Sequence, residues 1–137
     1  MEKIKKEIVL LKGKKQVWDL LVEPTHVKAW FALQNDWHGQ QAVNSLREGG
    51  EFLYQMASKN AKELYELKGT ISRVDPGNVL QVDLREGRTL SFALHAIDPT
   101  TTRVEFAIDP ETKNTVESQK RLWDELSSQF ESYVERH

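Results

Sequence analysis

The chain has 137 residues, of which 39% are hydrophobic and 29% are charged, and its formal net charge is −2. These proportions are typical of a globular protein, and the small net charge provides no basic surface for nucleic acid or an anionic membrane. The lack of cysteine excludes disulfides, thiol nucleophiles and cysteine-bound metals. Because no apolar run approaches the roughly 20 residues of a membrane span and no signal segment opens the chain, we expect a cytoplasmic protein.

The first part of the chain predicts one strand followed by two short helices. Residues 4–11 form a short stretch rich in β-branched side chains, which favours a strand. Residues 14–22 have helical spacing, and Pro24 ends this helix because the residue before a proline is driven out of the helical region. A second short helix is expected over residues 25–31, with Pro24 in its first turn. The two helices should therefore form a V.

From Gln40 to about residue 108, hydrophobic and polar residues alternate, which is the period of β-strands. Turn-forming sequences interrupt the alternation, for example at residues 58–60 and 75–78. Short turns between alternating strands predict antiparallel hairpins, here a meander of about six strands. The glycine pair at residues 49–50 precedes one strand, where we expect a bulge or a strong bend.

Residues 115–136 predict one long amphipathic helix. Its apolar side chains fall within an arc of roughly 120° at about 100° per residue, as expected of a helix that faces a core. Only Gln119 interrupts this arc, and Asn114 with Glu117 is the predicted N-terminal cap. At about 1.5 Å per residue, this is the only predicted element long enough to cover the apolar face of the sheet.

Helices kept apart from an antiparallel sheet predict an α+β fold. The motifs, in chain order, are Val17-Trp18, Pro24, His26, Trp30-Phe31, Gly49-Gly50-Glu51-Phe52, Gly69-Thr70-Ile71, Asp75-Pro76, Leu80, Thr102-Arg103-Val104, Trp123 and Leu126. Together they resemble the START-like (SRPBCC) superfamily, and most closely its branch of activator of heat-shock-protein-90 ATPase homologue-like proteins. The resemblance implies the helix-grip fold: a curved antiparallel sheet of about six to seven strands around the long C-terminal helix, with two short helices after the first strand.

The resemblance covers nearly the whole chain and implies a single domain over residues 1–137. Two positions depart from the family pattern. Glu23 replaces an aspartate that is common before the proline, and Leu122 replaces a glycine that often precedes the tryptophan of the last helix. The two-domain co-chaperones of the family are similar only in their second domain, so we expect a single-domain relative. Some family members bind hydrophobic small molecules in the cavity between sheet and helix.

No pattern in the sequence predicts a metal site, a cofactor or a catalytic motif. The four histidines, at positions 26, 38, 95 and 137, lack the spacing of paired metal ligands, and no G-x-S-x-G sequence is present. An enzyme of the polyketide cyclase or hydrolase kind stays an alternative, since relatives in the wider superfamily include cyclases. It would draw its acid–base groups from Glu48, Glu51, Tyr54, Tyr65 and His95, although strand parity points Glu51 and His95 away from the apolar face.

The leading hypothesis is a non-enzymatic protein that holds an apolar or aromatic metabolite, of the lipid, polyketide or flavonoid class, between the sheet and the last helix. The expected cavity lining is Trp37, Phe52, Tyr54, Tyr65, Leu67, Phe92, Phe106, Trp123 and Phe130. A tyrosine hydroxyl would orient the ligand, unless the two inward-facing tyrosines pair with each other and with Gln119.

Trp37, in the loop after the short helices, is the candidate lid of this cavity, or else an exposed or dimer-contact side chain. The runner-up function is a chaperone-associated stress factor, which would need an exposed apolar patch instead of a cavity.

Overall fold

The computed structural model describes residues 2–137 and contains seven strands and three helices within that range. The strands are β1 (Ile4–Leu10), β2 (Trp37–Asn44), β3 (Glu51–Ser58), β4 (Leu64–Asp75), β5 (Val79–Leu84), β6 (Thr89–Asp98) and β7 (Thr101–Ile108). The helices are α1 (Lys14–Val22), α2 (Pro24–Trp30) and α3 (Val116–Glu135). All strands form one sheet in the order β1-β7-β6-β5-β4-β3-β2, and every neighbouring pair is antiparallel. The predicted order of elements and the antiparallel meander are confirmed.

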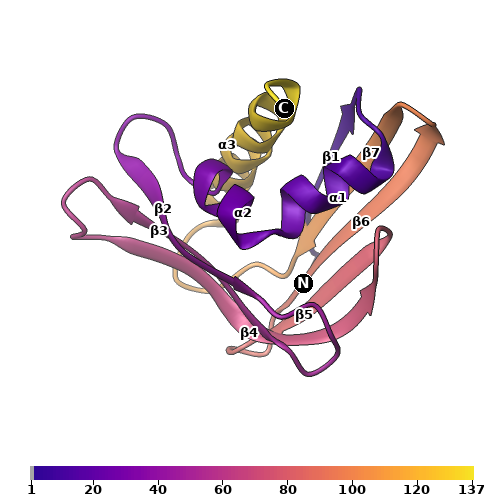
Figure 1. The fold of residues 1–137 in the computed structure, drawn as a ribbon. Helices are drawn as coiled ribbons and strands as arrows, with labels where there is room; N and C mark the ends of the chain where they lie inside the picture. Colours follow the sequence, from indigo (N-terminus) through magenta and orange to yellow (C-terminus); the bar gives the residue numbers. More distant parts are fainter. Residues whose placement is uncertain (1) are drawn as a thin grey trace.

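The sheet curls, and the helices lie on its concave side (Figure 1). Helix α3 packs along β1 and helix α2 packs on β2, so both edge strands of the sheet are covered by a helix. Inward-facing partners such as Phe92 and Phe106 are almost wholly buried. The hydrophobic core therefore lies between the curled sheet and the helices, and the predicted helix-grip architecture is confirmed.

The break between α1 and α2 leaves backbone carbonyls that side chains satisfy. Pro24 has no N–H to offer the fourth carbonyl before it, and α1 ends before its last carbonyls find helical partners. An unpaired carbonyl in a buried position costs free energy, so each needs another donor. Three side chains supply these bonds: Trp30 Nε1 to Leu20 O (3.0 Å), the Tyr54 hydroxyl to Leu21 O (2.9 Å) and Asn44 Nδ2 to Val22 O (3.2 Å).

The start of α3 differs from its prediction. The cap is Thr115, whose side chain accepts a hydrogen bond from the backbone N–H of Ser118 at 3.1 Å. Asn114 instead donates to Glu111 Oε1 from both its backbone and its side chain, so the prediction of an Asn114 cap is wrong. Gln119 is buried and bonds to the loop before the helix, which also rules out its predicted pairing with the tyrosines.

Strand β2 begins earlier than the sequence indicates. Trp37 was expected in a loop, but it is the first residue of the strand and is partly buried against the core. Gly39 explains the difference, because a Cβ on it would lie 2.0 Å from the carbonyl oxygen of Lys28 in α2. The absence of a side chain lets α2 lie directly on the strand.

Candidate functional site

The nine predicted lining residues all belong to the concave core or pack against it. Seven of them are almost wholly buried in one cluster: Phe52, Tyr54, Leu67, Phe92, Phe106, Trp123 and Phe130. The other two, Trp37 and Tyr65, are partly buried and pack against that cluster. Most of these side chains therefore contact one another, and a cavity enclosed by all nine stays a prediction.

Tyr54 illustrates how the centre of this cluster is filled. Its ring stacks on Phe52 with centroids 4.3 Å apart, and Trp30 meets it edge-on at 6.1 Å. Its hydroxyl donates to Leu21 O and accepts from Asn44 Nδ2 at 3.1 Å. Burial raises the pKa of Tyr54 far above its usual value, against the smaller lowering effect of the Asn44 hydrogen bond. The Tyr54 hydroxyl thus satisfies a backbone carbonyl at the break between α1 and α2.

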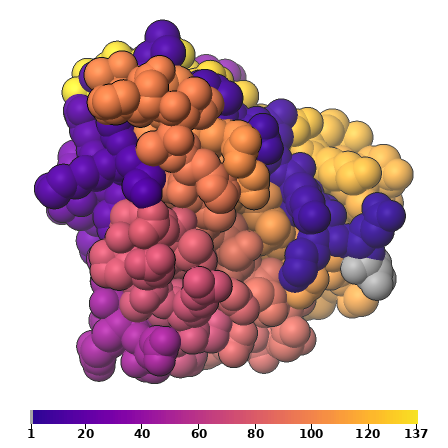
Figure 2. Space-filling view, turned by 90° about the vertical axis from the view of Figure 1, so that its right-hand side faces the viewer, coloured from indigo at the N-terminus to yellow at the C-terminus, as the bar shows by residue number. Residues whose placement is uncertain are grey.

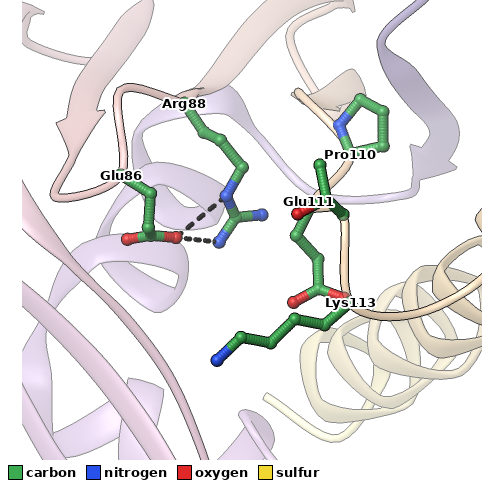
Figure 3. Close-up of a pocket in the computed structure, with 6 residues that line it drawn as sticks. Glu86, Arg88, Pro110, Glu111 and Lys113 are labelled. Atoms are coloured by element: carbon green, nitrogen blue, oxygen red, sulfur yellow. Dashed lines mark hydrogen bonds and ion pairs between the residues drawn. The ribbon is translucent and has the colours of Figure 1, made fainter.

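A pocket of about 280 Å³ opens beside this core, at the end of the sheet where β5 turns into β6. The register pair Leu90 and Ile108 shows that β6 begins next to the end of β7, which brings the two flanking segments together. Sequence reasoning missed the pocket because turns and loops carry no hydrophobic period. The β5–β6 turn lines it with Glu86 and Arg88, and the chain between β7 and α3 with Pro110, Glu111, Thr112 and Lys113 (Figure 3).

Two of the predicted lining residues, Tyr65 and Trp123, lie near this pocket without lining it. The charge of Arg88, at the end of the β5–β6 turn, acts on Tyr65 of β4. Burial raises the pKa of Tyr65 to about 12, although the charge of Arg88 lowers it and that of Glu111 raises it further. The indole of Trp123, from α3, also interacts with the hydroxyl and favours its deprotonated form. A protonated phenol therefore lies between β4 and α3, within reach of the charges at the pocket.

The charges around the pocket are mostly engaged. Arg88 donates from Nε and Nη2 to Glu86 Oε1 at 2.9 and 2.6 Å, as Figure 3 shows. Partial burial raises the pKa of Glu86, but hydrogen bonding and attraction from Arg88 outweigh it and hold the pKa below its usual value. Glu111 Oε1 accepts two hydrogen bonds from Asn114. Lys113 forms no ion pair within residues 2–137, so it is the one pocket cation without a carboxylate partner in that range.

The acid–base groups of the enzyme alternative are not gathered at this pocket. Glu48 and Glu51 are exposed beside the glycine pair. His95 is exposed on the outer face of the sheet, with Nε2 at 3.8 Å from Glu105. Of the proposed groups, Tyr65 alone is close enough for the pocket charges to act on it, and it does not line the pocket. Within residues 2–137 no three His, Asp or Glu side chains are grouped to hold a metal ion.

Comparison with known families agrees with this fold. The sequence profile of the family described as activator of Hsp90 ATPase homolog 1-like protein matches residues 14–135. The chain belongs to this AHSA1-like family. The resemblance to the START-like (SRPBCC) superfamily is thereby confirmed. No protein of curated function matches the sequence.

Several solved structures have the same architecture. An AHSA1-like protein of Aeromonas hydrophila has a TM-score of 0.83 and 28% identity, over 96% of this chain and 92% of that one. Chr148 of Cytophaga hutchinsonii has a TM-score of 0.82 and 28% identity, over 98% and 92%. DynU16, from the dynemicin biosynthetic locus, shares the fold alone, with a TM-score of 0.70 and 12% identity over 98% of this chain and 48% of that one.

Two further features of this AHSA1-like chain concern α3 and the helices in general. Leu122, at the position where a family glycine was noted, is partly buried and packs against the core, so the helix presents a large side chain there. Over residues 2–137, none of the helices combines the length and the apolar character that crossing a membrane requires.

Proposed function

We propose that this AHSA1-like chain is a non-enzymatic protein that binds a compact apolar or aromatic small molecule in the pocket between the β5–β6 turn and the segment before α3. The position of Tyr65 is the observation that supports it. The ring of Tyr65 stacks on Phe31 with centroids 6.2 Å apart. The charges of Glu86, Arg88 and Glu111 at the pocket act on the pKa of its hydroxyl. The pocket is lined by four charged side chains with Pro110 and Thr112, so apolar contact would come mainly from the neighbouring rings of Phe31 and Tyr65. Small-molecule sites combine apolar surface with a few polar groups.

The size of the pocket narrows the class of ligand. A volume of about 280 Å³ lies just below the range of roughly 300–1,000 Å³ found for small-molecule sites. Two fused rings suit this volume better than a long acyl chain, so aromatic polyketides and flavonoid fragments fit better than lipids. Removing apolar ligand surface from water would drive binding at about 25 cal/mol per Å².

Thermal-shift and native mass-spectrometry measurements with naphthalene-sized compounds test this proposal. A ligand that binds only the folded state raises the melting temperature as its concentration exceeds Kd, and the mass spectrum should show one ligand per chain. Thr112→Trp should fill the pocket mouth and weaken binding by about tenfold or more. Lys59→Trp, in the exposed β3–β4 turn, is the matched control and should bind as the parent does. Failure of every compound to stabilise the chain, or equal effects of the two variants, would contradict the proposal.

A second candidate function is a chaperone partner, favoured by the family description and by apolar side chains at one end of the molecule. Leu11 is 82% exposed and Ile97 is 56% exposed. The segment after β1 lies beside the β6–β7 turn, seen as indigo next to orange in Figure 2, where Thr102 Oγ1 donates to Lys12 O at 2.7 Å. The chain should then raise the ATPase rate of an ATP-dependent chaperone, and the double variant Leu11→Ser, Ile97→Ser should not. An unchanged rate with the parent chain dismisses this candidate.

A further inference from the structure

Gln119 interrupts the apolar arc of α3, yet it is buried, with 8% of its surface exposed. Its side-chain amide pairs with both backbone polar groups of Glu111. Oε1 accepts from the Glu111 N–H at 2.8 Å, and Nε2 donates to the Glu111 carbonyl at 3.1 Å. Nε2 also donates to the carbonyl of Asn114 at 3.0 Å. Because this set of partners needs one acceptor and one donor group side by side, a primary amide satisfies it and an apolar or charged side chain of the same length does not.

These hydrogen bonds hold one side of the pocket, which residues 110–113 form and which we call the pocket wall. The pocket wall has no regular secondary structure of its own. Glu111 Oε1 accepts hydrogen bonds from the backbone and the side chain of Asn114 at 2.7 and 2.6 Å, which closes the segment on itself. Gln119 then ties it to α3. Gln119 does not line the pocket, so it contacts the pocket wall and not the space that the wall encloses.

A segment without regular structure binds a ligand more tightly when it is already held in the binding shape, because less conformational freedom is lost on association. The apparent dissociation constant rises in inverse proportion to the fraction of chains whose site has that shape. If the pocket wall kept its shape in one chain of ten, the affinity would fall about tenfold. The hydrogen bonds of Gln119 can therefore control affinity without any contact with the ligand.

We propose that Gln119 is the positioning residue of this site, and that it keeps the pocket formed before a ligand arrives by fixing the pocket wall through Glu111 and Asn114. This inference rests on the proposed function and adds to it the residue that preorganises the pocket. It also explains why a buried position of α3 carries an amide where the neighbouring inward positions are apolar.

Binding kinetics of 2-acetylnaphthalene, followed by tryptophan fluorescence in a stopped-flow instrument, test the inference. Gln119→Met keeps the length of the side chain and removes the amide. It should lower the association rate constant about tenfold or more and leave the dissociation rate constant within about twofold, because the pocket wall has its shape once the ligand is bound. Gln129→Met is the matched control: the same change on the same helix, where Gln129 Nε2 donates to the carbonyl of Ala32 at 3.1 Å. Both of its rate constants should equal those of the parent chain.

Asn114→Ala is a second variant at an exposed position, so its folding is not at risk. It removes the side-chain hydrogen bond to Glu111 alone and should slow association by roughly two- to fivefold.

Hydrogen exchange of the Asn114 amide tests the pocket wall in the free chain. This N–H donates to Glu111 Oε1, a bond that Gln119→Met does not itself remove. Its exchange should nevertheless become about tenfold faster in Gln119→Met, and saturating 2-acetylnaphthalene should slow it again. A purely local loss at position 119 would leave the Asn114 amide as it is in the parent chain.

The outcomes separate this inference from the proposed function. Equal association rates in the parent chain and Gln119→Met, equal slowing by Gln129→Met, or unchanged exchange at Asn114 would overturn the positioning role and leave the binding function standing. Failure of every naphthalene-sized compound to bind the parent chain would overturn both.

Discussion

Tyr54 and Tyr65 lie on neighbouring strands and face the same core, yet their hydroxyl groups have different surroundings. The alternation of the sequence predicts both as inward-facing residues, and it cannot distinguish them further. The fold brings different atoms to the two hydroxyl groups. The carbonyl of Leu21 lies at Tyr54, and the β5–β6 turn with Arg88 lies near Tyr65. Those contacts join residues far apart in the sequence, so no local period encodes them.

Tyr54→Phe should lower the free energy of unfolding by about 1–2 kcal/mol, because it leaves the Leu21 carbonyl buried without its donor. Tyr65→Phe removes a hydroxyl that donates to no carbonyl in the described range, so it should cost less than Tyr54→Phe. Urea unfolding followed by circular dichroism measures both. Equal losses in the two variants would argue against the structural role assigned to the Tyr54 hydroxyl.

Asp109 joins β7 to the starts of β1 and β6, and its role should depend on pH. A hydrogen bond from Lys3 at 2.8 Å, and then one from the backbone N–H of Thr89, hold the pKa of Asp109 below its usual value. A carboxyl whose pKa is lower in the folded state adds stability that is present above the unfolded pKa of about 3.9 and is lost as pH falls through the folded pKa. Asp109→Asn should therefore be less stable than the parent at pH 7, and the difference should shrink below about pH 4. Denaturant titrations at a series of pH values measure it, and a difference that persists undiminished at pH 2 would contradict the assignment.

Among the elements, helices and central strands could be predicted from periodicity, while their ends depended on tertiary contacts. Pro24 fixed the break between α1 and α2 because its chemistry acts locally. Trp37 was wrongly assigned to a loop because a strand that begins under a helix shows no alternation at that point. The cap of α3 moved from Asn114 to Thr115 because both residue types cap helices and only the geometry decides between them.

Gly39→Ala tests the contact between β2 and α2. Its Cβ would meet the Lys28 carbonyl oxygen at 2.0 Å, so backbone must move, and we expect a loss of about 1–3 kcal/mol with faster amide exchange in α2. Gly77→Ala is the control: its Cβ would meet nothing within 4 Å, but its φ of +82° strains an alanine. That variant should lose stability without any selective effect on α2. Unchanged exchange in α2 of Gly39→Ala would show that the close approach is dispensable.

At the scale of the whole molecule, the order of elements was sufficient for the fold class but not for the site. Hairpins place each strand from β3 to β7 beside its predecessor, so that part of the sheet follows from short turns alone. The pairing of β1 with β7 joins the first and the last strand of the chain, and no short turn predicts it. The pocket is built from segments between strands and from charged residues such as Arg88 and Lys113, which resemble ordinary surface residues in the sequence.

We propose that a small molecule binds in the pocket between the β5–β6 turn and the segment before α3, near Trp123. A titration of 15N-labelled chain with 2-acetylnaphthalene, observed through the indole N–H signals, tests it most directly. The indole of Trp30 donates to Leu20 O within the core and serves as the internal reference. We predict that the Trp123 signal shifts in a saturable way while the Trp30 signal stays in place. A shift of Trp30 without Trp123, or no shift of any indole signal at saturating ligand, would contradict the claim.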